Sequence, residues 1–164
     1  SELREEWMNL MITEPSARLA ERSFCVGGKG FDICLGKART TGYMSYSEFR
    51  RFCCQSRLCL NITRWSHTSV YASSTARPFE LAAFGACVVS QPYNGIGEWF
   101  EEGKEMVIIR NKEEVASVYQ MLLDSENERE KIGERARARI LKDHTYQKRA
   151  EELTSVLKGC TPLN

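Results

Sequence analysis

The sequence lacks the long apolar run that a membrane-spanning helix requires. Such a helix needs about 20 consecutive apolar residues, and no segment of this chain approaches that length. The first residues also lack the apolar core and the cleavage site of a secretory signal. We therefore expect a cytoplasmic protein with no transmembrane segment.

Net charge is also nearly absent. The 23 Lys and Arg residues are balanced by 22 Asp and Glu residues, which leaves a formal charge of +1 at pH 7. Proteins that bind nucleic acids or anionic membranes commonly present an excess of basic residues. The composition gives no reason to expect either partner, and we predict that the chain binds no nucleic acid.

Histidine is rare, and the cysteines have no paired spacing. The chain has two histidines, His67 and His144, and seven cysteines without a C-x-x-C pair. Structural zinc sites need four such ligands at characteristic spacings, so we expect no metal site. Cysteines in apolar stretches such as Phe24–Val26 act as small buried hydrophobic residues. None has the basic setting and histidine partner of a catalytic nucleophile.

Short apolar runs and amphipathic segments alternate along the 164 residues, which suffice for one compact domain. Strands are predicted within 22–31, 58–62, 86–91 and 105–110. Helices are predicted over 2–21 with a break near Pro15, from about 46, over 77–84, over 97–103, from 112, from 126 and from 146. This alternation indicates a Rossmann-like, doubly wound α/β domain, with a mainly parallel sheet and helices on both faces.

Several residues at the predicted boundaries have clear local roles. Ser45 or Ser47 would cap the helix that begins near residue 46, and Gly85 would end the helix at 77–84. Gly27, Gly28 and Gly30 follow the first strand and could cradle a phosphate. No helix start follows them directly, so we favour a plain turn. Residues 67–76 form a long polar loop.

In doubly wound sheets, ligands bind beyond the carboxyl ends of the strands. The segment 73–77 opens a predicted helix there, and the free N–H groups and dipole of a helix start suit a phosphate or diphosphate. Arg77 would add a bidentate donor, and Glu80 could accept hydrogen bonds from two ribose hydroxyls. On the residues alone a plainer interpretation is narrowly preferred, in which Glu80 complements the helix dipole and Arg77 is a surface residue.

Three motifs together resemble a known family. They are R-x-F-E-x-x-A-x-G at 77–85, G-x-x-E-x-F-x-x-G-x-E at 95–105 and H-T-Y-x-x-R-A at 144–150. With the LNITR segment at 60–64, they resemble the C-terminal, nucleotide-sugar-binding domain of GT-B glycosyltransferases, and most closely the group 1-like transferases related to CgeB proteins. Each motif is weak alone, but the ordered set over about residues 40–157 is specific.

The resemblance implies a donor site for a nucleotide sugar, with UDP- or GDP-sugar as substrate and with no cofactor or metal ion. Glu80 matches the glutamate that binds the donor ribose. Tyr43 would line the base pocket, although an ordinary half-buried aromatic residue is an equally good interpretation. The full set is Glu80 for the ribose; Ser74, Thr75, Ala76 and Arg77 for the phosphates; Gly42, Tyr43 and Met44 for the base; and Asn61 and Arg64 facing the same crevice.

Two departures from the family pattern affect these expectations. Many retaining members carry a second glutamate eight residues before the ribose-binding one, and this chain has Ala72 there. The catalytic residues are therefore unassigned. The chain also begins in what resembles the first helix of the family domain, so we expect 1–164 to be one domain of a larger protein whose N-terminal acceptor domain is missing.

This interpretation has consequences for assembly and activity. A missing central strand would expose sheet edges, which favours a rearranged or homodimeric assembly. An isolated half would lack the closed cleft that excludes water, so we expect no sugar transfer by this chain alone. The alternative is a non-catalytic Rossmann-like module that binds a nucleotide or a protein, and a non-hydrolysing sugar epimerase is a more distant possibility.

The C-terminal segment carries dense charge of both signs. Residues 126–152 mix acids and bases, which predicts solvated helices rather than an RNA-binding surface. Thr145 is placed to cap the last helix. The resemblance implies that Tyr146 packs against the sheet and that His144 is structural.

Overall fold

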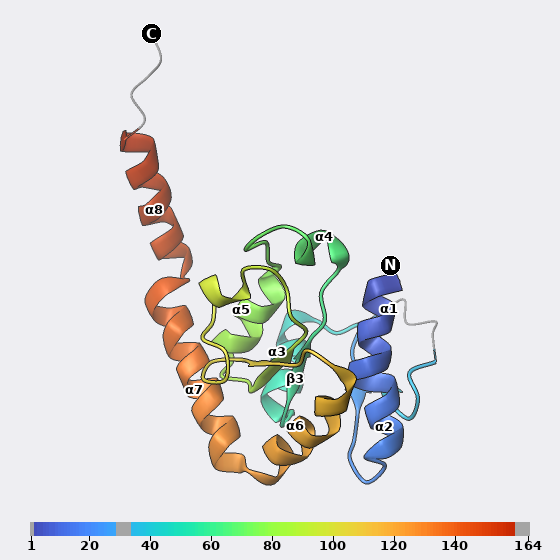
Figure 1. The fold of residues 1–164 in the computed structure, drawn as a ribbon. Helices are drawn as coiled ribbons and strands as arrows, with labels where there is room; N and C mark the ends of the chain where they lie inside the picture. The colour runs from blue at the N-terminus through green and yellow to red at the C-terminus, as the bar shows by residue number, and fades with distance from the viewer. Residues whose placement is uncertain (1, 29–33, 160–164) are drawn as a thin grey trace.

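The computed structural model describes residues 2–28 and 34–159. A parallel sheet in the order β3-β4-β5 lies at its centre (Figure 1). These strands are β3 (Cys59–Asn61), β4 (Val88–Ser90) and β5 (Val107–Ile108). A separate parallel pair consists of β1 (Cys25–Val26) and β2 (Arg39–Thr40).

Helical segments surround both sheets, and their order along the chain follows the predicted alternation. They are α1 (Glu2–Met8), the π-helical turn η1 (Asn9–Thr13), α2 (Glu14–Arg18), α3 (Tyr46–Gln55), α4 (Trp65–Thr68), α5 (Ala76–Ala83), the 3-10 turn η2 (Ile96–Glu98), α6 (Lys112–Asp124), α7 (Glu126–Asp143) and α8 (Tyr146–Gly159).

The central sheet is covered on both faces. Successive side chains of a strand point to opposite faces, and in β4 Val88 and Val89 accordingly belong to different apolar clusters. Val88 packs in the cluster that includes Leu81 of α5, while Val89 packs in the cluster that includes Tyr119 of α6. Parallel strands with helices on both faces confirm the predicted fold class.

The first helix is interrupted as predicted, since α2 begins at Glu14, directly after Thr13. Pro15 has no N–H and cannot donate to the carbonyl of Met11 four residues before it. The buried hydroxyl of Tyr119 donates to that carbonyl instead, at 2.8 Å. The chain accommodates this exchange in the π-helical turn Asn9–Thr13.

The predicted helix ends are confirmed at three places. Ser45 and Glu48 form a capping box at the start of α3. Gly85, with φ of 75°, follows α5 and donates to the carbonyl of Ala82 at 2.9 Å. The Thr145 hydroxyl accepts from the Lys148 amide at 3.2 Å, which caps α8.

Other predictions are wrong in extent or place. The helix expected at 97–103 is only the 3-10 turn at 96–98, and the polar loop follows the short helix α4. Tyr146 does not pack against the sheet, because its side chain is 97% exposed on α8, which projects away from the body in Figure 1. The predicted turn around Gly27 and Gly28 is described only to residue 28, and Gly30 lies outside the described residues.

None of the helices in the described ranges is both long and apolar enough to cross a membrane.

Candidate functional site

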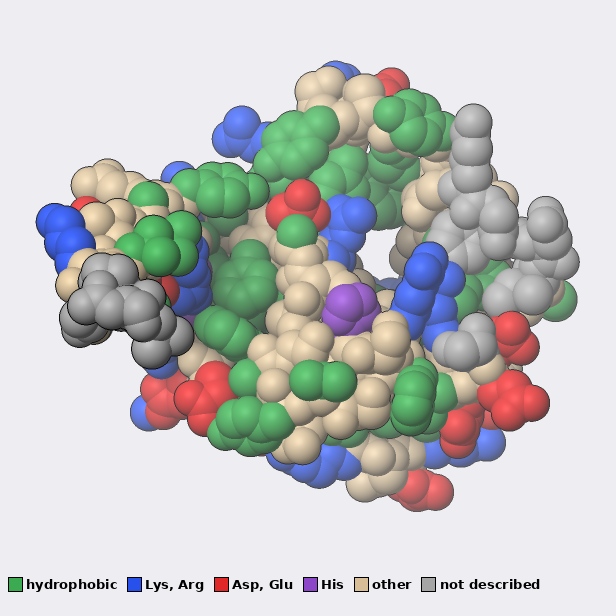
Figure 2. Space-filling model, turned by 90° about the horizontal axis from the view of Figure 1, so that it is seen from above, with side chains coloured by type: hydrophobic (Ala, Val, Ile, Leu, Met, Phe, Trp, Pro, Cys, Tyr) green, Lys and Arg blue, Asp and Glu red, His purple; other side chains and the backbone are tan. Residues whose placement is uncertain are grey.

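The carboxyl end of β3 borders a cavity of about 340 Å³. β3 leads into Arg64 and helix α4 on one side, and the start of α5 closes the other side. Figure 2 looks onto this edge and shows a histidine and Lys or Arg side chains around a hollow. The cavity is lined by Arg4, Asn61, Ile62, Thr63, Arg64, His67, Thr75 and Arg77.

The lining of this cavity is basic. Arg4 reaches it from α1, Arg64 from the start of α4, and Arg77 from the first turn of α5. Three guanidinium groups around one space favour an anionic ligand. We call this space the arginine cavity.

The first turn of α5 adds partial positive charge. Thr75 occupies the N-cap position, but its side chain makes no capping hydrogen bond. The amides of the first turn are therefore left to water or to a ligand. Ala76 is the first residue of the helix, so its amide points out of the helix end.

Arg77 is held in place by two contacts. Its Nη1 lies 3.2 Å from Oε2 of Glu80, one turn further along α5. Its guanidinium group also stacks over the ring of Phe49, 4.1 Å from the centroid. Glu80 thus pairs with an arginine of the cavity but is not among the residues that line it, and its side chain remains 32% exposed.

Other predicted residues are engaged within the protein. The Asn61 amide donates to the Ser90 hydroxyl at 2.9 Å, so this buried side chain ties β3 to β4. The Ser74 hydroxyl lies 3.2 Å from the hydroxyl of Tyr93. Asn61 still borders the arginine cavity, whereas Ser74 is not among its lining residues.

The predicted base-binding turn borders a second, larger cavity of about 870 Å³. Gly42 has a φ of 71°, which a residue with a side chain rarely adopts. Tyr43 and Met44 line this cavity, and Tyr43 is 73% exposed. Arg77 borders both cavities. Of the predicted phosphate residues, Thr75 and Arg77 line the arginine cavity, and Arg77 also borders the cavity that Tyr43 and Met44 line.

Polar residues that the sequence did not single out also lie here. The Thr63 amide donates to Oε1 of Gln91 at 3.2 Å. Within the described part of the chain, Thr63 Oγ1 and Gln91 Nε2 are buried without a hydrogen-bond partner. Buried polar atoms are usually satisfied, so a ligand or water in this region would find them available.

Little in the sequence indicated these residues. Thr63 lies within the LNITR segment, so the position after a buried strand could have marked it. Arg4 is about 60 residues from the other arginines along the chain, and no local pattern connects it to them. Only the packing of α1 against the carboxyl edge brings it to the cavity.

Ala72 occupies the place where a second glutamate was considered, and its backbone is strained. Its φ is 52°, an uncommon value for a residue with a side chain. Its amide donates to the Asn94 carbonyl at 2.8 Å, and its carbonyl accepts from Nε1 of Trp99 at 3.0 Å. A Cβ on Gly95 would lie 2.4 Å from the Ala72 nitrogen, so only glycine fits there.

The thiols at the centre of the fold do not have the surroundings of a catalytic nucleophile. Cys53, Cys59 and Cys87 are buried. Burial raises the pKa of Cys87 to about 11. The Cys59 thiol donates to the Cys53 carbonyl at 3.7 Å. A hydrogen bond with the Cys53 side chain, and then burial, raise the pKa of Cys59. Cys59 and Cys87 are therefore poor nucleophiles, as expected of small buried residues. The hydrogen bond with the Cys59 side chain instead lowers the pKa of Cys53.

Solved structures share this fold at low sequence identity. HepE from Anabaena in complex with UDP-glucose has a TM-score of 0.75 and 11% identity, over 98% of this chain and 46% of its own. Sucrose-phosphate synthase from Thermosynechococcus elongatus has a TM-score of 0.75 and 10% identity, over 97% and 43%. A glycosyltransferase from Rickettsia africae has a TM-score of 0.69 and 14% identity, over 93% and 44%.

These likenesses define the class of the fold, which is the Rossmann-like α/β domain of GT-B glycosyltransferases. A family described as glycosyl transferase-like matches residues 4–155 of this sequence. The chain belongs to that family, which confirms the resemblance found in the motifs. It spans less than half the length of the three solved proteins. The search among curated proteins found no match.

Proposed function

We propose that this chain is the donor-binding domain of a glycosyltransferase that moves a sugar from a nucleoside diphosphate to an acceptor. The observation that carries the proposal is the arginine cavity, in which Arg4, Arg64 and Arg77 meet the uncapped first turn of α5. Family membership and the UDP-glucose complex of HepE support a sugar nucleotide as the ligand.

The diphosphate would occupy the arginine cavity. Guanidinium groups donate paired hydrogen bonds to phosphate oxygens, and helix-start amides add to them. As the bond between the sugar and the diphosphate breaks, negative charge grows on the leaving oxygen, and these donors would stabilise it. In this proposal the arginines supply the positive charge, and no metal ion is required.

The nucleoside would extend from the diphosphate toward Tyr43 and Met44. Glu80 would accept hydrogen bonds from the ribose hydroxyls while it keeps Arg77 in position. Tyr43 and Met44 offer an aromatic face and a polarisable thioether to a flat base. Uracil is the first base to test because of the UDP-glucose complex of HepE, and guanine is the second.

A second candidate is a non-catalytic module that binds a nucleotide through the same cavity. Ala72 favours this second candidate, because the methyl side chain of alanine offers no carboxylate on the sugar side of the site. Recognition of the ribose by Glu80 separates the two candidates. A donor domain has to hold the nucleoside in a fixed orientation, whereas a basic cavity alone needs only the phosphates.

Calorimetric titration with UDP, GDP and ADP tests the proposal. We expect one nucleotide to bind and Arg64→Gln to weaken it at least tenfold, because a charge-assisted hydrogen bond contributes about 1.5–3 kcal/mol. Arg135→Gln removes the same charge from α7 and is the matched control, with unchanged affinity expected. A folded chain that binds none of the three, or equal weakening in both variants, would contradict the proposal.

A second titration tests the role of Glu80. The nucleotide that binds is compared with its 2′-deoxy form, in the natural chain and in Glu80→Gln. If Glu80 holds the ribose, removal of the 2′-hydroxyl weakens binding in the natural chain but has little further effect in the variant. An equal effect in both proteins would favour the non-catalytic module.

A further inference from the structure

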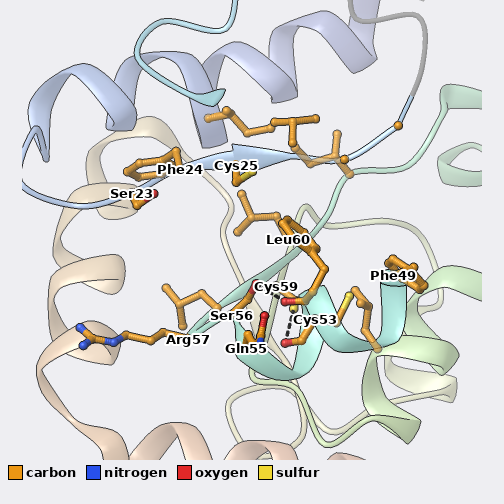
Figure 3. A pocket seen from close by; sticks show the side chains of 18 of the residues that line it. Ser23, Phe24, Cys25, Phe49, Cys53, Gln55, Ser56, Arg57, Cys59 and Leu60 are labelled. Carbon is orange, nitrogen blue, oxygen red and sulfur yellow. Dashed lines mark hydrogen bonds between the residues drawn. The ribbon is translucent and has the colours of Figure 1, made fainter. Parts of the chain in front are cut away.

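A layer of buried polar side chains adjoins the arginine cavity where β3 and β4 end. β3 passes along the larger cavity, where Figure 3 shows Cys59 and Leu60, and the chain then continues to Thr63 at the arginine cavity. Four side chains, each at most 7% exposed, form what we call the polar layer: Asn61, Thr63, Ser90 and Gln91.

Hydrogen bonds between members of the polar layer tie β3 to β4. The Asn61 side-chain amide donates to the Ser90 hydroxyl at 2.9 Å, and that hydroxyl donates to the Gln91 carbonyl at 2.8 Å. The Gln91 backbone amide donates to the Asn61 carbonyl at 3.3 Å. The layer is therefore held in place before any ligand arrives.

The backbone of Thr63 fixes the orientation of the Gln91 side chain. The Thr63 N–H lies 3.2 Å from Oε1 of Gln91. An N–H group can only donate, so the oxygen of the Gln91 side chain has to face it. The nitrogen Nε2 then lies on the other side, and within the described residues it is buried without a hydrogen-bond partner. The layer thus has a donor left over.

The Thr63 hydroxyl is a second group without a partner. Oγ1 is buried and makes no hydrogen bond to the part of the chain that the structure describes. Thr63 lines the arginine cavity, whereas Gln91 is not among the lining residues. A buried hydroxyl that lacks a hydrogen bond lowers stability. A ligand atom in the cavity that accepts from Thr63 would remove this penalty.

The charges around Thr63 indicate the kind of acceptor that fits. Three guanidinium groups border the cavity, those of Arg4, Arg64 and Arg77, and neither Asp nor Glu is among the described residues that line it. Guanidinium groups can only donate. A ligand therefore has to bring several acceptor oxygens and negative charge, as a diphosphate does. A sugar hydroxyl would satisfy Thr63 but would leave the positive charge unbalanced.

We propose that Thr63 is a binding residue of the arginine cavity, and that its hydroxyl donates a hydrogen bond to a phosphate oxygen of the bound diphosphate. The inference rests on the proposed function for the nature of the ligand. It adds a buried, uncharged donor to the arginines and the helix-start amides. The hydrogen bond to Gln91 fixes the backbone from which this hydroxyl projects.

The test uses substitutions that separate the hydroxyl from the rest of the side chain. Thr63→Val keeps the branched shape and removes the hydroxyl, whereas Thr63→Ser keeps the hydroxyl and removes a methyl group. Thr154→Val makes the first change on the exposed helix α8 and is the matched control. Calorimetric titration with inorganic pyrophosphate measures affinity without a nucleoside, and thermal unfolding without ligand gives the melting temperature.

We expect Thr63→Val to weaken pyrophosphate binding about tenfold, as the loss of a hydrogen bond to a charged group does. The melting temperature should stay the same or rise, because the variant no longer buries an unpartnered hydroxyl. Thr63→Ser should restore most of the affinity. Thr154→Val should bind pyrophosphate as the natural chain does.

Three results would overturn the proposal. The first is equal affinity of Thr63→Val and the natural chain, and the second is an equal loss in Thr63→Ser, which would assign the effect to the methyl group. The third is a loss of affinity together with a lower melting temperature, which would assign the hydroxyl to the fold.

The same variants titrated with UDP, GDP and ADP separate this inference from the donor proposal. Pyrophosphate binding that depends on the Thr63 hydroxyl, with no nucleotide bound, would contradict the donor proposal and support the role of Thr63. A nucleotide that binds equally well to Thr63→Val would leave the donor proposal intact and overturn this one. A folded chain that binds neither pyrophosphate nor a nucleotide would overturn both.

Discussion

At the scale of single residues, His144 is a histidine whose contacts change its pKa. Its ring lies edge-on to Phe79 and Trp99, with centroids 5.4 and 5.7 Å apart. Nη2 of Arg149 donates to its Nδ1 at 2.7 Å, so the ring accepts at this nitrogen as a neutral imidazole. Burial first, and then the charge of Arg149, lower the pKa of His144 below its usual 6.5. These are the contacts of a packed side chain, and the structural role of His144 stays a prediction.

The lowered pKa of His144 predicts a loss of stability in mild acid. Below about pH 6.5 the unfolded chain takes up a proton that the folded chain resists, so the free energy of unfolding falls as the pH falls. Denaturant unfolding at pH 7.5 and 5.5 should show this decrease in the natural chain. His144→Phe, which keeps an aromatic ring, should reduce it.

Tyr146→Phe, which changes an exposed ring two residues away, is the control and should keep the full decrease. The carboxylates whose pKa lies below 4.5, such as Glu14 and Glu102, contribute only at lower pH than this comparison uses. An unchanged pH dependence in His144→Phe would show that the ring is not the source.

At the scale of elements, α7 packs closely against the turn between α5 and β4. A Cβ on Gly133 would lie 2.1 Å from the Gly85 carbonyl oxygen, and a backbone atom cannot move aside as a flexible side chain can. Glycine at this point lets α7 approach the turn that Gly85 forms at the end of α5. The packing of α7 thus depends on two glycines far apart in the sequence.

Gly133→Ala should destabilise the protein despite the higher helix propensity of alanine. The propensity gain is about 1 kcal/mol, whereas the forced separation of α7 from the turn costs about 1–3 kcal/mol or more. Urea unfolding should show a net loss. Gly97→Ala is the matched control, because a Cβ there meets nothing within 4 Å. Equal stability of both variants would contradict this account of the contact.

At the scale of the whole molecule, α8 extends beyond the body (Figure 1). None of its residues is buried, and Leu153, Val156 and Leu157 form an exposed apolar stripe at helical spacing. Its first turn is tied to the body by Arg149, which reaches His144 and lies 5.5 Å from the Trp99 ring centroid.

Removal of the residues after Glu152 should therefore leave the free energy of unfolding within about 0.5 kcal/mol of the full chain, as is usual for changes away from buried contacts. A shorter chain that ends at Thr145 also loses Arg149 and should be less stable. Denaturant unfolding of both truncations checks this. A large loss of stability in the chain that ends at Glu152 would mean that the apolar stripe packs against the body.

Much of the local structure could be predicted because it depends on neighbouring residues. The capping box at Ser45, the cap at Thr145 and the left-handed Gly85 follow from residue types within a few positions. Where the structure departs from the local predictions, the cause is tertiary. The break in the first helix lies where it was predicted, but its π-helical form was not, because the hydroxyl that takes the Met11 carbonyl belongs to Tyr119 of α6.

The candidate site was predictable only in part. Arg77, Thr75 and Arg64 were expected at a binding edge, and the structure places them around one cavity. Arg4 was not, since no motif near the N-terminus points to it. The base, phosphate and ribose roles of the predicted residues stay predictions that the titrations address.

By itself, the sequence determined the α/β class, the ends of several helices and the glycosyl transferase-like motifs, because these depend on local periodicity and on residues a few positions apart. Tertiary structure alone decided the meeting of Arg4 with Arg64 and Arg77, the larger cavity and the exposure of Tyr146. These features depend on which distant segments pack together, and that choice is made by the burial of the whole chain rather than by any single segment.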